Sequence, residues 1–176
     1  MKTNRTLKLI TLTAAIFGFA ATSFAQVGVG ATASASANIV TPIAITKTVD
    51  MDFGNIAVNN NAGTVQLAPS ESATRTPSGG VTLPTAVGNV KAAKFSVTGA
   101  ANYGFSITLP TSTVVVKNGS NTMNIDTFTS SLGALSTLSG SGAADFYVGA
   151  TLYVTGGQAE GAYTTETPFT VTVNYN

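Results

Sequence analysis

The sequence predicts an all-β protein, an antiparallel β-sandwich that follows an N-terminal signal peptide. Three observations support this fold class. The first 25 residues have the layout of an export signal, and only 9% of the whole chain is charged, with Gly, Ala, Ser, Thr and Val dominating the residues after the leader. About ten short apolar or alternating runs then succeed one another at intervals of roughly 8 to 15 residues, divided by turn signals. No stretch after the leader has a competing helical period.

The signal peptide is expected at residues 1–25. Its basic start contains three cations, Lys2, Arg5 and Lys8. An apolar stretch follows at residues 9–21, and Ser23 and Ala25 place small residues at the two positions that a signal peptidase recognises. The apolar stretch is short for a membrane-spanning helix, and an uncleaved anchor is the alternative. We therefore expect cleavage after Ala25, export, and no membrane span in the mature chain.

The composition of the mature chain excludes several classes of partner. Removing 25 of the 176 residues leaves 151, which suits one domain that buries about 70% of its unfolded surface. Five Lys or Arg residues then stand against seven Asp or Glu, a net charge of −2, which gives no electrostatic basis for binding nucleic acid or anionic lipid. The chain has no Cys, so it has neither a disulfide nor a lipidated cysteine.

Five strands are expected in the first half of the mature chain. The first contains Pro42, which has no N–H to donate, so we expect a bulge or a sheet edge there. A turn-prone stretch at residues 59–63 ends the second strand, and a polar loop at residues 69–80 precedes the fourth. The expected strands are residues 38–46, 51–58, 64–68, 81–83 and 92–99.

Five further strands are expected in the second half. Residues 103–109 form an antiparallel pair with the preceding strand, and Asn118-Gly119 is the strongest hairpin signal in the chain. Residues 130–142 are expected to be irregular. The expected strands are residues 103–109, 113–116, 122–128, 146–155 and 167–176. A closed outer-membrane barrel is the structural alternative, but it needs longer alternating segments and aromatic girdles.

The sequence offers little catalytic or metal-binding chemistry. It has no His and no Cys, which excludes Ser-His-Asp triads, Cys-His dyads and His-based metal sites. Asp50 and Asp52 lie two residues apart, on one face of a strand, but Ca²⁺ needs six or more oxygen ligands. Two carboxylate pairs have the composition of a glycosidase site but no surrounding cleft signal, Asp126 with Asp145 and Glu160 with Glu166. We therefore expect no enzyme activity, no metal and no cofactor.

Two alternating ribbons, one at each end of the mature chain, are the most informative features. Each has apolar residues at every second position, as expected of a strand that buries one face. The N-terminal ribbon has Val27, Val29, Ala31, Ala33, Ala35 and Ala37 on one face. The C-terminal ribbon has Phe169, Val171, Val173 and Tyr175 on one face. Gly161 precedes Tyr175 by fourteen residues, and Tyr163 follows that glycine by two.

At these residues the chain resembles chaperone–usher pilus subunits, whose last strand alternates, has a penultimate Tyr and follows a Gly about fourteen residues earlier. It resembles most closely the archaic, spore-coat-U-like subunits and an allied family of secreted bacterial domains of unknown function. Three segments agree in order with that pattern, Phe53-Gly54, residues 148–154 and residues 161–175. The chain departs from the spore-coat-U-like subunits in having no Cys, because those subunits usually carry a disulfide.

The resemblance implies a pilin-like, immunoglobulin-like sandwich that lacks one strand. A periplasmic chaperone and an outer-membrane usher then handle each subunit until the N-terminal extension of a neighbouring copy fills the gap. On this hypothesis residues 26–37 are the N-terminal extension, in which residues 27–37 are the donor strand, and residues 38–176 are the sandwich domain. Its groove, or its chaperone interface, includes Gly161, Tyr163, Phe169, Val171, Val173 and Tyr175. Eleven donor residues span about 36 Å. Burial of their Val and Ala side chains would contribute about 5 kcal/mol to the free energy of strand binding.

Two alternatives remain open at this point. The N-terminal ribbon is also compatible with a first strand of the domain itself, or with a disordered leader. The implied function is a structural subunit of a surface filament in adhesion or biofilm formation. The alternative function is a non-polymerising secreted sandwich that binds carbohydrate or another surface protein. Because the chain has no Trp and only five Tyr, the sequence favours assembly over sugar binding.

Overall fold

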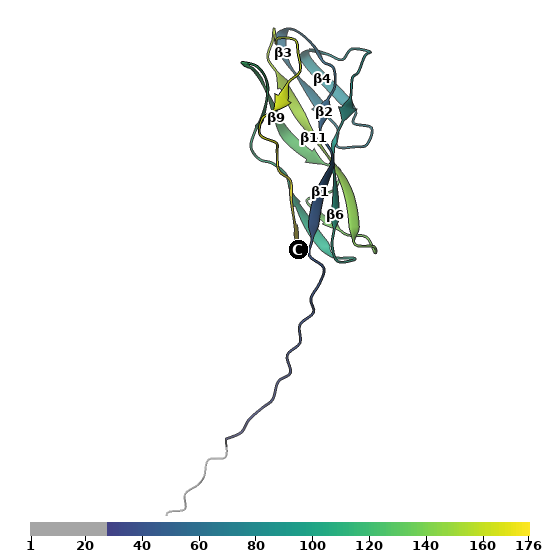
Figure 1. The fold of residues 1–176 in the computed structure, drawn as a ribbon, viewed down its shortest axis with the longest axis vertical. Helices are drawn as coiled ribbons and strands as arrows, with labels where there is room; N and C mark the ends of the chain where they lie inside the picture. The colour runs from purple at the N-terminus through teal and green to yellow at the C-terminus, as the bar shows by residue number, and fades with distance from the viewer. Residues whose placement is uncertain (1–27) are drawn as a thin grey trace, which may run out of the picture. The chain divides into compact units, whose positions relative to one another are not determined.

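The computed structural model describes residues 28–176 and confirms an all-β antiparallel sandwich. The strands all lie within one compact unit, Ile39–Asn176, which is distinct from the residues before it (Figure 1). The expected signal peptide, Gln26 and Val27 lie outside the described residues. Within residues 28–176, no helix is long and apolar enough to cross a membrane.

The described residues form thirteen strands. They are β1 (Ala44–Val49), β2 (Asp52–Phe53), β3 (Ala57–Leu67), β4 (Arg75–Thr82), β5 (Val90–Lys91), β6 (Ala93–Thr98), β7 (Gly104–Thr108), β8 (Val114–Asn118), β9 (Asn121–Ser130), β10 (Leu135–Thr137), β11 (Ala143–Val154), β12 (Thr164–Thr165) and β13 (Thr172–Tyr175).

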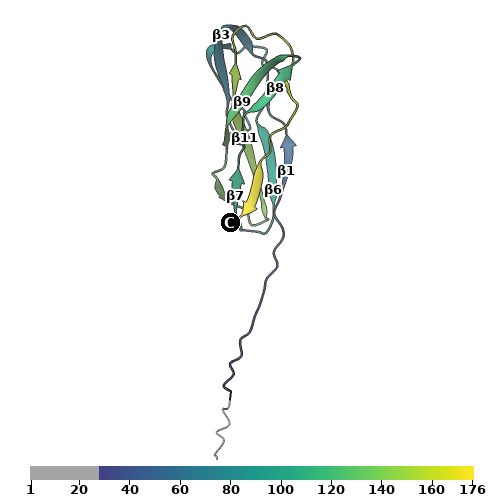
Figure 2. The same ribbon diagram turned by 90° about the vertical axis from the view of Figure 1, so that its left-hand side faces the viewer.

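The strands are arranged in a large sheet, a three-stranded sheet and a short two-stranded ribbon. The large sheet has the order β1-β6-β11-β9-β8-β12, and β3 and β4 extend it beside β11. Along one edge, β11 pairs first with β6 and then with β3, while β9 occupies its other edge. The second sheet has the order β10-β7-β13, and β2 pairs with β5. Figure 2 shows β13 in yellow, ending at the C-terminus near β7.

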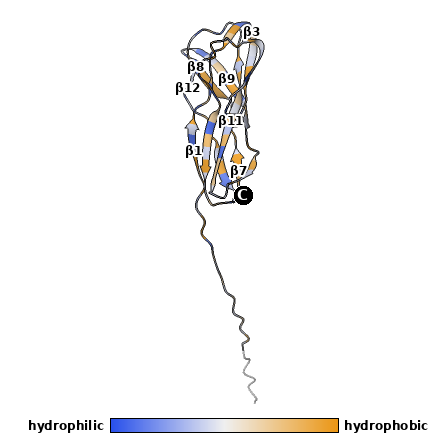
Figure 3. Cartoon of the chain, turned by 90° about the vertical axis from the view of Figure 1, so that its right-hand side faces the viewer, coloured by the Kyte–Doolittle hydropathy of each residue, from blue (hydrophilic) through white to orange (hydrophobic). Residues whose placement is uncertain are grey.

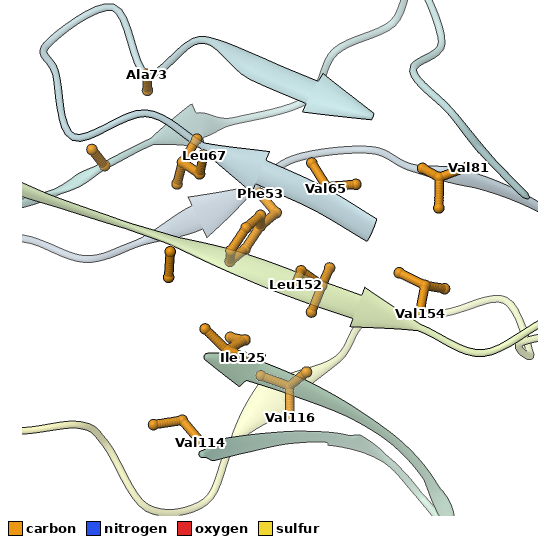
Figure 4. Packing of buried hydrophobic residues seen from close by; sticks show 12 residues of the cluster. Phe53, Val65, Leu67, Ala73, Val81, Val114, Val116, Ile125, Leu152 and Val154 are labelled. Atoms are coloured by element: carbon orange, nitrogen blue, oxygen red, sulfur yellow. The ribbon is translucent and has the colours of Figure 1, made fainter. Parts of the chain in front are cut away.

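The core follows from alternation along these strands, which carry both hydrophobic and hydrophilic residues (Figure 3). One cluster of buried side chains lies among β3, β8, β9 and β11, and Leu152 of β11 is near its centre (Figure 4). The second cluster lies between β6 and β11 on one side and β7 and β13 on the other, where Phe95 and Phe146 stack with ring centroids 5.5 Å apart. The described residues leave no buried side-chain polar atom without a hydrogen-bond partner.

The hairpin predicted at Asn118-Gly119 is confirmed, with its turn one residue later than expected. Asn118 pairs with Asn121, so Gly119 and Ser120 are the two turn residues between β8 and β9. Gly119 has a φ of 58°, in the left-handed region that glycine adopts without the steric cost of a Cβ.

The strands expected at residues 92–99 and 103–109 are present as β6 and β7, but the prediction that they pair is wrong. β6 pairs with β1 and β11, whereas β7 pairs with β10 and β13, so the two lie in different sheets. Both strands bury alternate side chains. This periodicity is the same for a hairpin and for two strands that face each other across a core.

Several expected boundaries are also wrong. The turn-prone residues 59–63 lie within β3, which bulges between Val58 and Gly63, and β4 occupies part of the expected loop at residues 69–80. These residues are mostly exposed and therefore show little burial pattern in the sequence. They are in strands because β3 and β4 pair with each other. The first strand begins at Ala44 and the last at Thr172, while β10 lies within the expected irregular stretch at residues 130–142.

The single strand expected at residues 51–58 is divided into β2 and the start of β3. Arg75 explains the division, because its Nη1 donates to the carbonyl oxygens of Phe53 at 2.6 Å and Asn55 at 2.7 Å. A guanidinium that binds both carbonyls fixes the irregular segment between the two strands.

Candidate functional site

The last strand, β13, has one free edge. It pairs with β7 from Thr172 to Tyr175, and the described part of the chain supplies no strand on its other side. The first strand, β1, likewise pairs only with β6 among these residues. The two strands approach each other without forming a ladder. The sandwich is therefore open along a seam between its first and last strands.

The backbone groups at the free edge belong to alternate residues. The N–H of Asn176 donates to the carbonyl of Gly104 at 3.2 Å, and the N–H of Ile107 points the other way, to the carbonyl of Ala134 at 2.9 Å. In an antiparallel ladder, hydrogen-bonded and non-hydrogen-bonded pairs alternate. Thr172 and Asn174 therefore bond to β7, and Val173 and Tyr175 direct their N–H and C=O groups toward the free edge.

The side chains from Phe169 to the end of β13 alternate with the same period. Val171 and Val173 are 6% and 8% exposed, Phe169 and Tyr175 are partly buried, and the residues between them are exposed. Across the seam, Ile43 and Ile45 are also partly buried and pack against the same cluster. The structure thus brings four of the predicted site residues, those from Phe169 to Tyr175, onto one apolar face at an unpaired edge.

Tyr175 closes one end of the seam. Its hydroxyl donates to the carbonyl of Thr41 at 2.7 Å and accepts from the N–H of Ala100 at 2.6 Å. A Cβ on Gly99 would lie 2.3 Å from this hydroxyl oxygen, so the close approach requires glycine at that position. Tyr175 therefore ties the end of β13 to the segment that precedes β1. Sequence reasoning found Tyr175 but not these partners, because backbone acceptors leave no residue-type signal.

A hollow of about 590 Å³ lies at the other end of β13, among the residues that precede it. Its apolar wall includes Leu109, Val114 and Phe169, and Lys117 and Glu166 contribute polar lining. Their Nζ and Oε2 atoms form an exposed ion pair 2.7 Å apart. The free edge of β13 thus runs from a hollow at its start to the Tyr175 hydroxyl at its end.

Gly161 and Tyr163 lie apart from this edge. The adjacent β12 pairs with β8 and not with β13. The Tyr163 hydroxyl donates to the carbonyl of Ala159 at 2.8 Å and accepts from Gln158 Nε2 at 3.0 Å. A Cβ on Gly161 would lie 2.3 Å from Asn118 Nδ2, so Gly161 packs on the β8–β9 hairpin. These contacts position the segment between β11 and β12.

The described part of the N-terminal ribbon, residues 28–38, contains no strand. All of its side chains are exposed, and that of Val29 is 99% exposed. Of the predicted donor residues, Val29, Ala31, Ala33, Ala35 and Ala37 lie in this segment.

The pairs Asp50 with Asp52 and Asp126 with Asp145 do not form joint sites. Asp50 pairs with Lys47, whereas Asp52 accepts from the N–H of Gly54 at 2.8 Å. Among the described residues, no group of three or more His, Cys, Asp or Glu side chains could hold a metal ion. Asp126 is opposite Thr151, six residues along β11 from Asp145. That is about 20 Å at 3.3 Å per residue, beyond the separation of glycosidase carboxylates.

Asp145 and Lys94 form an ion pair on the exposed face of β6 and β11, with Lys94 Nζ 2.9 Å from Asp145 Oδ2. Hydrogen bonds from Ser96 and from Lys94 lower the pKa of Asp145 below its ordinary value. The hydrogen bond to Asp145 and its negative charge raise the pKa of Lys94. This pair is compensated locally, as expected of a structural contact.

Comparison with protein families assigns most of the chain. The domain of unknown function DUF4402 matches residues 43–175. The chain belongs to the DUF4402 family. The DUF4402 match spans β1 to β13, and it therefore covers both strands that border the seam. The ribbon at residues 28–38 precedes the DUF4402 match. Neither the curated proteins nor the solved structures compared with the chain include a match.

Proposed function

We propose that this DUF4402 protein is a structural subunit of a bacterial surface filament, assembled by donor-strand exchange and acting in adhesion or biofilm formation. The observation that carries the proposal is the unpaired edge of β13, where Val173 and Tyr175 direct backbone groups outward beside an apolar seam. An edge of this kind promotes aggregation unless another strand covers it.

The occupant we propose is the N-terminal ribbon of a neighbouring copy. Its apolar residues recur with period two, as do the backbone groups and inward side chains of β13. Ile43, Ile45 and Phe169 at the seam are already partly buried, so a donor strand with small Ala side chains would add little bulk there. Because each copy gives a strand to the next, assembly does not close and yields a fibre.

Export through the periplasm to the cell surface is part of the same proposal. A free apolar edge needs protection during transit, which is the role of the proposed periplasmic chaperone, and the outer-membrane usher is the proposed site of assembly. The alternative, a non-polymerising sandwich, uses the same export route but needs no partner on β13.

A pair of single substitutions tests the donor strand. Ala33→Asp places a carboxylate on the face that we propose enters the seam, whereas Ser34→Asp places it on the opposite face. Both positions are exposed in the single chain, so neither change should affect folding of the domain. We expect Ala33→Asp to abolish, and Ser34→Asp to preserve, SDS-resistant multimers and filaments in surface material released by shear. Deletion of residues 26–37 should give a folded, non-polymerising subunit.

Three results would overturn the proposal. They are intact multimers from Ala33→Asp or from the deletion, equal loss from both aspartate variants, and wild-type protein that occurs at the cell surface only as a monomer. Genes for a chaperone and an usher next to that of this protein would support it.

A further inference from the structure

The outer face of the large sheet carries a row of neutral side chains around one exposed tyrosine. The register places Ser78 of β4, Thr64 of β3, Tyr153 of β11, Asn124 of β9 and Val115 of β8 opposite one another in turn. Their neighbours along the strands, such as Val65 and Leu152, are buried, so the row faces away from the core.

The ring of Tyr153 lies along this sheet. Its hydroxyl is 3.4 Å from Oγ1 of Thr127, whereas its cross-strand partner on β9 is Asn124. Thr127 is three residues beyond Asn124, about 10 Å along the strand. A tyrosine that stood perpendicular to the sheet would not reach it. Tyr153 is nonetheless 44% exposed, so a large part of its surface remains accessible to a ligand.

Tyr153 also contributes to the lining of a hollow of about 480 Å³. Thr64, Ser78, Thr122, Asn124 and Thr155 supply side-chain hydroxyl and amide groups to its lining, and none of its lining residues is charged. Asn124 is exposed and lines this hollow, so its amide is accessible to a ligand.

The charged residues on the adjacent strands β8 and β9 are already engaged. Asp126 accepts from the Thr113 hydroxyl at 3.1 Å and from the N–H of Thr127 at 2.7 Å. Lys117 is paired with Glu166. The hollow therefore offers an aromatic plane with neutral donors and acceptors around it, which suits an uncharged ligand with one apolar face and many hydroxyl groups.

We propose that this surface, defined by Tyr153, Asn124, Thr64 and Ser78, binds a neutral glycan. A pyranose ring stacks its C–H face on Tyr153, and its hydroxyl groups bond to the Asn124 amide and to the Thr64 and Ser78 hydroxyls. The residues are on β3, β4, β9 and β11, separate from the β1–β13 seam. The inference is thus independent of filament assembly.

The test is titration calorimetry of the full mature chain with uncharged hexasaccharides, namely those of cellulose, laminarin, mannan and chitin, and with oligogalacturonate as the charged comparison. We expect at least one neutral hexasaccharide to bind. Tyr153→Ala should then weaken binding at least tenfold, Asn124→Ala should weaken it severalfold, and Tyr153→Phe should retain most of it.

Tyr147→Ala is the matched control. Tyr147 lies on the same face of β11, six residues before Tyr153, where its ring is 5.7 Å from Lys94 Nζ. We expect this variant to bind as the wild type does, and circular dichroism should verify that each variant is folded. The proposal is overturned if no neutral hexasaccharide binds, if oligogalacturonate binds more tightly than all of them, or if Tyr153→Ala binds like the wild type.

Discussion

Replacing Tyr175 by Phe tests the contact that closes the end of the seam. The substitution removes only the hydroxyl. It keeps the ring, which packs edge-to-face on Tyr103 with the ring centroids 5.6 Å apart. Two hydrogen bonds are lost, one to the carbonyl of Thr41 and one from the N–H of Ala100. Each bond contributes about 1 kcal/mol net, so the free energy of unfolding should fall by about 2 kcal/mol.

Urea unfolding followed by circular dichroism measures this change. With an m-value of about 2 kcal/mol/M, the midpoint should fall by about 1 M, and Tm should fall by about 4–8 °C. Tyr103→Phe is the matched control, because the Tyr103 hydroxyl has no hydrogen-bond partner among the described residues, and it should change the midpoint little. Wild-type stability in Tyr175→Phe, or an equal loss in Tyr103→Phe, would refute this account of the contact.

Three further predictions concern other contacts of the sandwich. Gly119→Ala should cost about 1 kcal/mol in urea unfolding, because a left-handed residue then carries a Cβ in open space, and Gly119→Asn should cost less. Arg75→Ala should lower stability by about 2 kcal/mol through loss of the bonds to Phe53 and Asn55, and Arg75→Lys should recover less than half of this in thermal unfolding. The lowered pKa of Asp145 stabilises the fold above the ordinary carboxyl pKa, and this contribution is lost as the pH falls through the acid range. Between pH 7 and pH 3, Tm should therefore fall less in Asp145→Asn than in the wild type, and an equal fall in both would contradict this sign.

The sequence predicted the elements whose burial pattern is strong. β6, β7, β11 and the β8–β9 hairpin lie close to their expected positions because alternate side chains in these strands are buried or because Asn118-Gly119 specifies a turn. Only the end of β4 was predicted, by the strand expected at residues 81–83, because its other residues are mostly exposed and their place depends on the ladder with β3. Partner choice between β6 and β7 could not be predicted, because alternation fixes which face is buried and not which strand lies beside it.

In the candidate sites, too, the sequence predicted the features marked by alternation and not those that depend on strand pairing. Alternation predicted the apolar face from Phe169 to Tyr175, but the free edge depends on which strands occupy the neighbouring positions. The hydrogen bond between Tyr175 and Thr41 joins residues 134 positions apart through a backbone acceptor, which no residue pattern marks. The Tyr153 surface was missed for a related reason. Thr64, Ser78 and Asn124 come from three strands, and only the register brings them together.

The tie between Tyr175 and Thr41 also determines how a filament built as proposed would carry load. Tension along the fibre would enter each domain at the segment before β1, next to the end of β13, and leave through the donor strand paired along β13. The load would then act parallel to the strands, and the ladder hydrogen bonds would resist in shear together instead of opening one by one. Tyr175 would thus contribute to the tensile strength of the fibre as well as to the stability of one subunit.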